Sequence, residues 1–303
     1  MAYIHTAHSS SGHFLGFDVS HQKTLPVVQR TFTLTEADRD DVLDFLNERP
    51  VHTVAMSSFI HDNGMESPLN RGKFYGYRNA LGDLEGVALI GHTTLVEARS
   101  ADALNALSIT ARKHSHEIHL IMSSDDLALD FWANAIDTLS APRLVCREKL
   151  FEVGFPFPVQ NCNHTVRLAT ADELLQVAEA QAEVAFIETG SDPMLRDREG
   201  FLKRVLRRIE QGRVYVVMDG NELVFKADVV SLTEKTAYLE GVYVSEHRRG
   251  NNIGSSCLAD VARRLLGRVR NVCLLSNVEF TGAHKSFQNA GFRAVGECTT
   301  VFV

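Results

Sequence analysis

The second half of the chain carries the clearest alternation of apolar and polar residues. The stretch "RVYVVMDGNELVFKADVVS" (213–231) has two runs rich in β-branched residues on either side of Asp219-Gly220. Such runs predict strands, and an Asp-Gly pair between them predicts a hairpin. In "SSCLADVARRLLGRV" (255–269), apolar residues recur every three or four positions, which predicts a helix ending near Gly267. Residues 164–303 as a whole predict the order β-α-α-β-β-β-α-β-α-β.

The first half of the chain repeats this order. "QRTFTLTEADRDDVLDFLNE" (29–48) again places a strand before a capped helix, and "SSFIHDNGMESP" (57–68) resembles "VAFIETGSDP" (184–193). We therefore expect an internal duplication. The predicted fold is α/β (α+β, mixed sheets), with two tandem domains that are each a central, mostly antiparallel sheet flanked by helices. The expected boundaries are a flexible N-terminal arm at 1–27, a first domain at 28–153, a linker at 154–163 and a second domain at 164–303.

A glycine- and asparagine-rich turn stands out in the second half. "GVYVSEHRRGNNIGSS" (241–256) runs from a strand pattern through this turn into a helix. Glycine and asparagine allow successive N–H groups to point inward, and a following helix adds its unpaired N-terminal donors. This arrangement suits an anion, although an ordinary connection with solvated arginines has the same appearance. The first copy has "EARSADALNAL" (97–107) in this place, without glycines, so we expect only the second half to bind the ligand.

Composition narrows the classes of function. The chain has 303 residues, 45% of them hydrophobic, and a net charge of −7, which argues against a general nucleic-acid or membrane-surface binder. Its five cysteines show no CxxC spacing, so we expect reduced thiols, no disulfide framework and no zinc site. No stretch has the pattern of a membrane span or a secretion signal. The expected location is the cytoplasm.

Two motifs of the second half carry a family resemblance. One is "GVYVSEHRRGNNIG" (241–254), and the other is "NVEFTGAHKSFQNAGF" (277–292), where Asn277, Ala283 and Gly291-Phe292 fall in register with a recurrent ending. Through them, residues 163–303 resemble the GNAT superfamily of acyl-CoA-dependent N-acetyltransferases. The whole chain resembles bacterial two-domain members of this superfamily, which have a degenerate first copy and a signature that stands here as "SPLNRGKFYGYRN" (67–79).

The resemblance implies that acetyl-CoA is the cosubstrate and that no metal takes part. The loop would hold the pyrophosphate, and the edge of the preceding strand would pair with the pantetheine arm. One backbone amide would face the thioester oxygen. The cofactor-binding residues implied in this way are Val242, Tyr243, Val244, Arg249, Gly250, Asn251, Asn252, Ile253, Gly254, Ser255, Asn277 and Phe287.

Two residues depart from the family pattern. Asn252 stands where the loop usually has its first glycine, and asparagine tolerates left-handed backbone angles better than most residues. Phe287 stands where the family commonly has a tyrosine that protonates the departing thiolate, and phenylalanine has no proton to donate. A thiol with a pKa of about 8.5 can still leave as an anion, so turnover does not require that tyrosine.

Four polar residues are candidates for catalysis or acceptor binding. Glu240 and Asn277 are the catalytic candidates: Glu240 as a general base or a structural glutamate, and Asn277 as a cofactor contact or a cap for the next helix. Glu188 and Asp192 lie in an acidic loop that would suit a cationic acceptor, or would simply be solvated.

The expected activity is transfer of acetyl from acetyl-CoA to a primary amine by direct attack in a ternary complex. No cysteine or serine lies beside a credible base, which disfavours an acyl-enzyme. The expected partner is a small-molecule or peptide amine, with no nucleic acid and no membrane. Phe287 and the degenerate first half motivate an alternative, a non-catalytic acyl-CoA-binding sensor or interaction protein. The oligomeric state is not predictable from the sequence.

Overall fold

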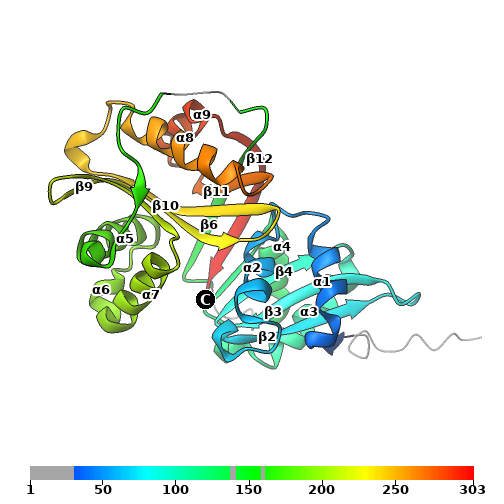
Figure 1. Cartoon of the computed structure of the whole chain (residues 1–303). Helices are drawn as coiled ribbons and strands as arrows, with labels where there is room; N and C mark the ends of the chain where they lie inside the picture. Colours follow the sequence, from blue (N-terminus) through cyan, green and yellow to red (C-terminus); the bar gives the residue numbers. More distant parts are fainter. Residues whose placement is uncertain (1–30, 137–140, 158–160) are drawn as a thin grey trace, which may run out of the picture.

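A computed structural model describes residues 31–136, 141–157 and 161–303 (Figure 1). The predicted arm at 1–27 lies outside these residues, as does part of the predicted linker. The first half, which we define as the chain through Gly154, contains β1 Thr31–Thr33, α1 Arg39–Leu46, α2 Val54–Asn63, β2 Gly72–Arg78, β3 Leu84–Gly91, β4 Thr93–Ala98, α3 Ala101–Arg112, β5 Leu120–Ser124, α4 Leu127–Ala135 and β6 Leu144–Gly154.

The second half, from residue 161 onward, repeats this order with one additional short helix. It contains β7 Arg167–Leu168, α5 Leu174–Thr189, α6 Pro193–Arg196, α7 Arg198–Glu210, β8 Val214–Asp219, β9 Glu222–Leu232, β10 Thr236–Val244, α8 Ile253–Leu266, β11 Asn271–Asn277, α9 Thr281–Asn289 and β12 Arg293–Phe302. The predicted order of elements and the mixed α/β class are confirmed.

The two halves share one twelve-stranded sheet. Its strand order is β1-β2-β3-β4-β5-β12-β6-β11-β10-β9-β8-β7. The last strand of each half is therefore exchanged: β6 lies between β12 and β11, and β12 lies between β5 and β6. The sequence predicts a sheet for each copy, whereas the exchanged strands join the two into a single sheet that runs through the centre of the molecule (Figure 1).

Helices cover both faces of this sheet, because its strands are apolar on both sides. In the second half, Val214 and Val216 pack under α5 and α7, whereas the alternate residues Tyr215 and Val217 pack under α8. The first half is built in the same way, with α1 and α2 on one face and α3 and α4 on the other. Among the helices of the described residues, none has the length and apolar character that a membrane span needs.

Candidate active site

A cleft opens where two parallel strands part. β10 and β11 are paired from Thr236 and Asn271 as far as Leu239 and Leu274. Beyond Leu239, β10 stays paired with β9 on its other side, so its backbone groups that face β11 are left without a ladder partner. The gap is a cleft of about 700 Å³, in the size range of small-molecule sites.

A β-bulge lies at the start of the unpaired part of β10. Glu240 pairs with Asp228 and Tyr243 pairs with Lys226, so β10 contains one extra residue between these two pairs. Gly241 within the bulge has φ +58°. A Cβ there would lie 2.2 Å from the Gln181 Oε1 atom and 2.6 Å from the Lys226 Nζ atom. The position therefore requires glycine both for its backbone angle and for space.

A buried charged network supports the bulge from beneath. The fully buried Lys226 ammonium donates to Gln181 Oε1 at 2.6 Å and to the Gly241 carbonyl at 3.1 Å, and it is paired with Asp228 at 2.8 Å. Arg208 binds the other oxygen of Asp228 at 2.9 Å. Burial lowers the pKa of Lys226, and the negative charge of Asp228 acts in the opposite direction. The network holds the Gly241 carbonyl in place at the cleft wall.

The predicted anion loop lies at one end of the cleft. Its backbone turns through Gly250 at φ +84° and Asn252 at φ +58° before α8 begins at Ile253. Asn252 therefore adopts the left-handed conformation expected of it, and its side chain makes no capping hydrogen bond. The first N–H groups of α8 have no acceptor within the helix, and the positive end of the helix dipole lies behind them.

The loop offers backbone donors that suit a pyrophosphate such as that of acetyl-CoA. A Cβ on Gly254 would lie 3.2 Å from Val244 Cγ2 and 3.3 Å from Ser286 Oγ, so a larger residue would narrow the cleft where the loop meets β10 and α9. Backbone donors at a helix N-terminus, open to a cleft, are a common phosphate site. The residues present therefore match the group that the family resemblance implies.

Most basic side chains around the loop are engaged in ion pairs. Arg248 contacts Asp219 at 2.7 Å and Glu222 at 3.3 Å. Arg249 donates from Nε to the Val244 carbonyl at 3.0 Å and pairs with Glu183 at 3.3 Å. Lys285 in α9 lines the cleft and has no ion pair within the described residues. The sequence did not single out Lys285, whose place in the cleft wall is seen only in the structure.

Phe287 occupies the cleft wall as part of the core. Its ring is 7% exposed and packs edge-on against Phe151 of β6, with the ring centroids 5.6 Å apart. Phe287 also lines the cleft. Its ring offers no hydroxyl and therefore no proton donor at this place in the wall.

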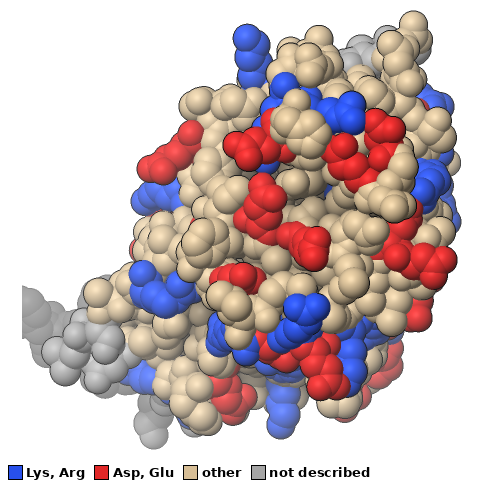
Figure 2. Space-filling view, turned by 90° about the vertical axis from the view of Figure 1, so that its left-hand side faces the viewer, with Lys and Arg blue, Asp and Glu red and all other residues tan. Residues whose placement is uncertain are grey.

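Three glutamates meet on the side of the cleft nearest α5. Glu240 of the bulge and Glu188 of α5 line the cleft, and Glu148 of β6 lies beside them. Burial raises the pKa of Glu148 to about 7, and the charge of Glu240 adds to this rise. Glu188 opens to the cleft, yet partial burial and the charges of Glu240 and Glu148 raise its pKa to about 7 as well. Seen from the side of α5 and α6, several acidic side chains gather near the middle of the surface (Figure 2).

The structure brings together most of the residues that the sequence indicated. The cleft is lined by the predicted residues Glu188, Glu240, Val242, Tyr243, Val244, Arg249, Gly250, Asn252, Ile253, Gly254, Ser255 and Phe287.

Three other candidates have side chains that form hydrogen bonds within local turns. The Asn277 side chain accepts from the Glu279 amide at 2.9 Å, Asp192 caps α6 by accepting from Met194 at 2.8 Å, and Asn251 donates to the Arg248 carbonyl.

In the first half, the region between β4 and β5 that corresponds to the cleft between β10 and β11 is nearly filled. "TTLVEA" of β4 (93–98) pairs with its neighbours as "TAYLEG" of β10 (236–241) does, so Glu97 takes the place of Glu240 and Ala98 that of Gly241. The pairing of β4 with β3 continues without a bulge. The cavity beside Glu97 measures about 30 Å³. This space is too small for a cosubstrate. That only the second half binds one remains a prediction.

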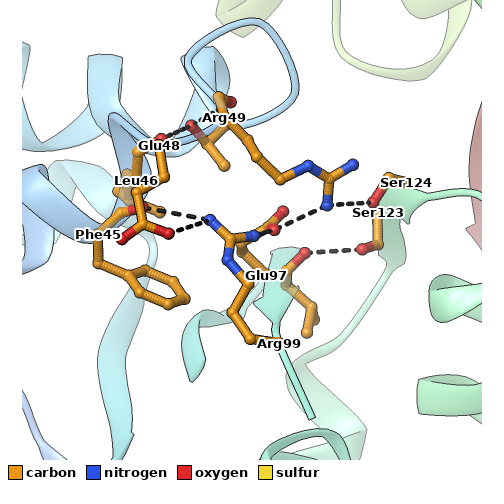
Figure 3. Close-up of polar contacts among 10 residues, drawn as sticks. Phe45, Leu46, Glu48, Arg49, Glu97, Arg99, Ser123 and Ser124 are labelled. Atoms are coloured by element: carbon orange, nitrogen blue, oxygen red, sulfur yellow. Dashed lines mark hydrogen bonds and ion pairs between the residues drawn. The ribbon is translucent and has the colours of Figure 1, made fainter. Parts of the chain in front are cut away.

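Two arginines fill the first-half site (Figure 3). Glu97 is 2% exposed and is paired with Arg49 at 2.9 Å and with Arg99. Arg49 also donates to Ser124 Oγ at 3.3 Å, and Arg99 donates to the Phe45 carbonyl at 3.3 Å. The glutamate that faces a cleft in the second half is thus a structural anion in the first.

Comparison with known proteins agrees with this geometry. The sequence matches no protein-family model, and a comparison with curated proteins found no match. A GCN5-related N-acetyltransferase from Sphaerobacter thermophilus is similar in structure, with a TM-score of 0.57 and 14% identity, over 92% of this chain and 96% of its own. A tandem GNAT protein from the clavulanic acid biosynthesis pathway gives a TM-score of 0.54 and 12% identity, over 90% of this chain and 97% of its own. A GNAT-family acetyltransferase from Colwellia psychrerythraea gives a TM-score of 0.53 and 13% identity, over 90% of this chain and 98% of its own. The chain therefore has the tandem fold of the GNAT acetyltransferases.

Proposed function

We propose that the protein transfers an acetyl group from acetyl-CoA to a primary amine. The observation that carries this proposal is the cleft between β10 and β11, which has donors for a pyrophosphate at one end and a carboxylate at the other. A ligand lying along the cleft would pair with the free backbone groups of β10 at Val242 and Val244. Its phosphates would meet the amides from Gly250 to Ser255.

Acetyl-CoA supplies an acyl group activated as a thioester. Glu240 takes a proton from the acceptor's ammonium group, directly or through water, and passes it to solvent. The free amine attacks the carbonyl carbon and the C–N bond forms. The nitrogen then loses its second proton to water as the C–S bond breaks. CoA leaves as a thiolate that takes a proton from water. The backbone amides at the bulge face the carbonyl oxygen, where fixed donors stabilise developing negative charge.

The proposal is tested with purified protein, acetyl-CoA and a panel of primary amines, by measuring release of the CoA thiol. We expect amine-dependent thiol release in the wild type and a loss of about a hundredfold in kcat for Glu240→Gln, the usual scale for removing a general base. Glu246→Gln is the control, because Glu246 is an exposed glutamate in the turn after β10 and does not line the cleft. If the rate of thiol release were the same with and without amine for every amine tested, the proposal would be contradicted.

Phe287 favours a second candidate function, binding of acyl-CoA without transfer. The phenylalanine completes the cleft wall but supplies no acid to the departing thiol. A protein of this kind would bind acetyl-CoA and CoA in the same cleft and would show no amine-dependent thiol release. The amine panel therefore separates the two functions.

A further inference from the structure

A serine of β11 lies across the cleft from the bulge of β10. The last residues that pair the two strands are Leu239 and Leu274, and two positions further on are Gly241 in the bulge and Ser276 in β11. Ser276 is 7% exposed and lines the cleft. β10 continues through Val244 before it reaches the anion loop. Ser276 therefore lies where the strands begin to part, and not where the loop would bind phosphate.

Ser276 and Glu240 lie on opposite faces of the sheet. Leu274 packs in the core under α8, and Ser276 shares its face because side chains alternate along a strand. Glu240 is directly opposite Asp228 of β9, so these two side chains lie on one face, and Asp228 binds Arg208 of α7 there. A thioester held in the gap would therefore have Glu240 on the side of α5 and α7, and Ser276 on the side of α8 and α9.

The Ser276 hydroxyl is available to a ligand in the cleft. Among the described residues it has no hydrogen-bond partner, and it is not one of the enclosed polar atoms that lack a partner. Two other serines of the wall belong to the loop end, where Ser255 donates to the loop backbone at 3.0 Å and Ser286 lies beside Gly254. Phe287 packs in the same core cluster as Leu274, on the face of Ser276. Ser276 thus offers a donor on the face where Phe287 offers none.

We propose that Ser276 is a catalytic residue that donates a hydrogen bond to the sulfur of the departing CoA. The inference rests on the proposed function. The acceptor amine reaches the thioester from the face of Glu240, whereas the arm of CoA comes from the loop before α8, so the sulfur lies toward Ser276. As the C–S bond breaks, its electron pair moves to the sulfur, and the developing charge strengthens a hydrogen bond donated there. The serine keeps its proton, because an alcohol is a weaker acid than a thiol, and the thiolate takes its proton from water.

The experiment titrates the thiol of CoA bound to the full-length protein, by the ultraviolet absorbance of the thiolate. The spectrum of the complex with desulfo-CoA, in which hydrogen replaces the thiol, is subtracted to remove the protein's own cysteines and tyrosines. Ser276→Ala removes the donor, and Ser276→Thr keeps it. The matched control is Ser231→Ala, because Ser231 of β9 is also 7% exposed and does not line the cleft.

In Ser276→Ala we expect the pKa of the bound thiol to rise by about one unit, because a hydrogen bond to the thiolate is lost. Ser276→Thr and Ser231→Ala should keep the wild-type value. With an amine that is turned over, kcat of Ser276→Ala should fall by about tenfold, the equivalent of one pKa unit, and the Kd for acetyl-CoA should change by less than about twofold.

A bound thiol that titrates at the same pH in the wild type and in Ser276→Ala would overturn the inference and leave the proposed cleft in place. A wild-type protein that does not bind CoA at all would instead contradict the proposed function, and the inference with it. The two failures are therefore distinguishable.

Discussion

Two positions at the cleft, Gly241 and Phe287, show how single residues set its properties. Gly241 allows the bulge that turns the backbone of β10 away from a regular ladder, and its neighbours leave no room for a side chain. Phe287 lines the cleft with a ring that has no proton to donate, where the proposed reaction would release a thiol. Gly241 therefore sets the backbone geometry of the cleft, and Phe287 leaves that part of the wall without a proton donor.

Gly241→Ala should destabilise the protein by about 2 kcal/mol or more beyond the cost of the backbone angle alone, because the new methyl group collides with Gln181 and Lys226. The control is Gly220→Ala in the β8–β9 turn. Gly220 has φ +59°, against +58° for Gly241, and a Cβ there meets nothing within 4 Å. Urea unfolding measures both variants. Equal losses of unfolding free energy would show that the clash is relieved without cost.

Phe287→Tyr should raise kcat by about tenfold or more, the lower range of a general acid's contribution, because the phenol adds a proton donor beside the leaving sulfur. Steady-state rates of thiol release measure the effect. Phe292→Tyr serves as the control, since Phe292 is buried in the same core and does not line the cleft. A rate unaffected by Phe287→Tyr would show that thiolate departure does not limit turnover.

At the scale of elements, the approach of α5, β6 and β10 brings three glutamates together. Burial, with a smaller contribution from like charges, raises the pKa of both Glu148 and Glu188 from an ordinary 4.5 to about 7. Between these values the folded protein holds protons that the unfolded chain has released. Its free energy of unfolding should therefore fall as the pH rises from about 4.5 to about 7, and these two groups should add no further change above that.

The double variant Glu148→Gln/Glu188→Gln should show a flatter dependence of unfolding free energy on pH between 5 and 7, because neither glutamine titrates. It should also be more stable than the wild type at pH 8, where the wild type holds both charges. Urea unfolding at several pH values measures the slope, with Glu152→Gln as the control. Identical slopes in the wild type and the double variant would contradict the placement of these carboxylates.

The elements themselves were largely predictable from local patterns. The Asp219-Gly220 hairpin, the helix after the glycine-rich loop and the repeat between the halves follow from periodicity and turn residues. The cleft residues of β10 and the loop were found through the family resemblance. Glu148 was not, because nothing in "REKLFEV" distinguishes it, and its position near Glu188 and Glu240 depends on strand exchange between segments more than a hundred residues apart. Asn277 and Asp192 remain predictions as site residues, although both side chains cap turns in the structure.

At the scale of the whole molecule, a duplicated fold has kept one open cleft and closed the other. The halves form one sheet through their exchanged strands and are joined further by Arg213, which contacts both carboxylate oxygens of Asp62 at 2.7 Å. Glu97 with Arg49 and Arg99 takes the space of a second site. We infer that this buried charged group contributes to folding, and that the open cleft alone contributes to ligand binding.

Arg99→Ala should lower the free energy of unfolding by about 3 kcal/mol, because it weakens the pairing of a buried carboxylate. The affinity for acetyl-CoA should stay within a factor of two of the wild type, a change of about 0.4 kcal/mol. Arg39→Ala is the control, since its pair with Glu36 is exposed and should be worth under about 1 kcal/mol. A large loss of acetyl-CoA affinity in Arg99→Ala would show that the first-half site takes part in binding.

The measurement that tests the central claim most directly is calorimetric titration of acetyl-CoA into wild-type protein and Gly254→Glu. The glutamate would place a negative charge and added bulk where the loop meets Val244 and Ser286. Gly267→Glu adds the same charge at the other end of α8, away from the cleft. We expect a Kd near micromolar, about 8 kcal/mol, for the wild type and for Gly267→Glu, with binding lost in Gly254→Glu. Absence of binding to the wild type at millimolar acetyl-CoA, or equal binding to all three proteins, would contradict the assignment of this cleft.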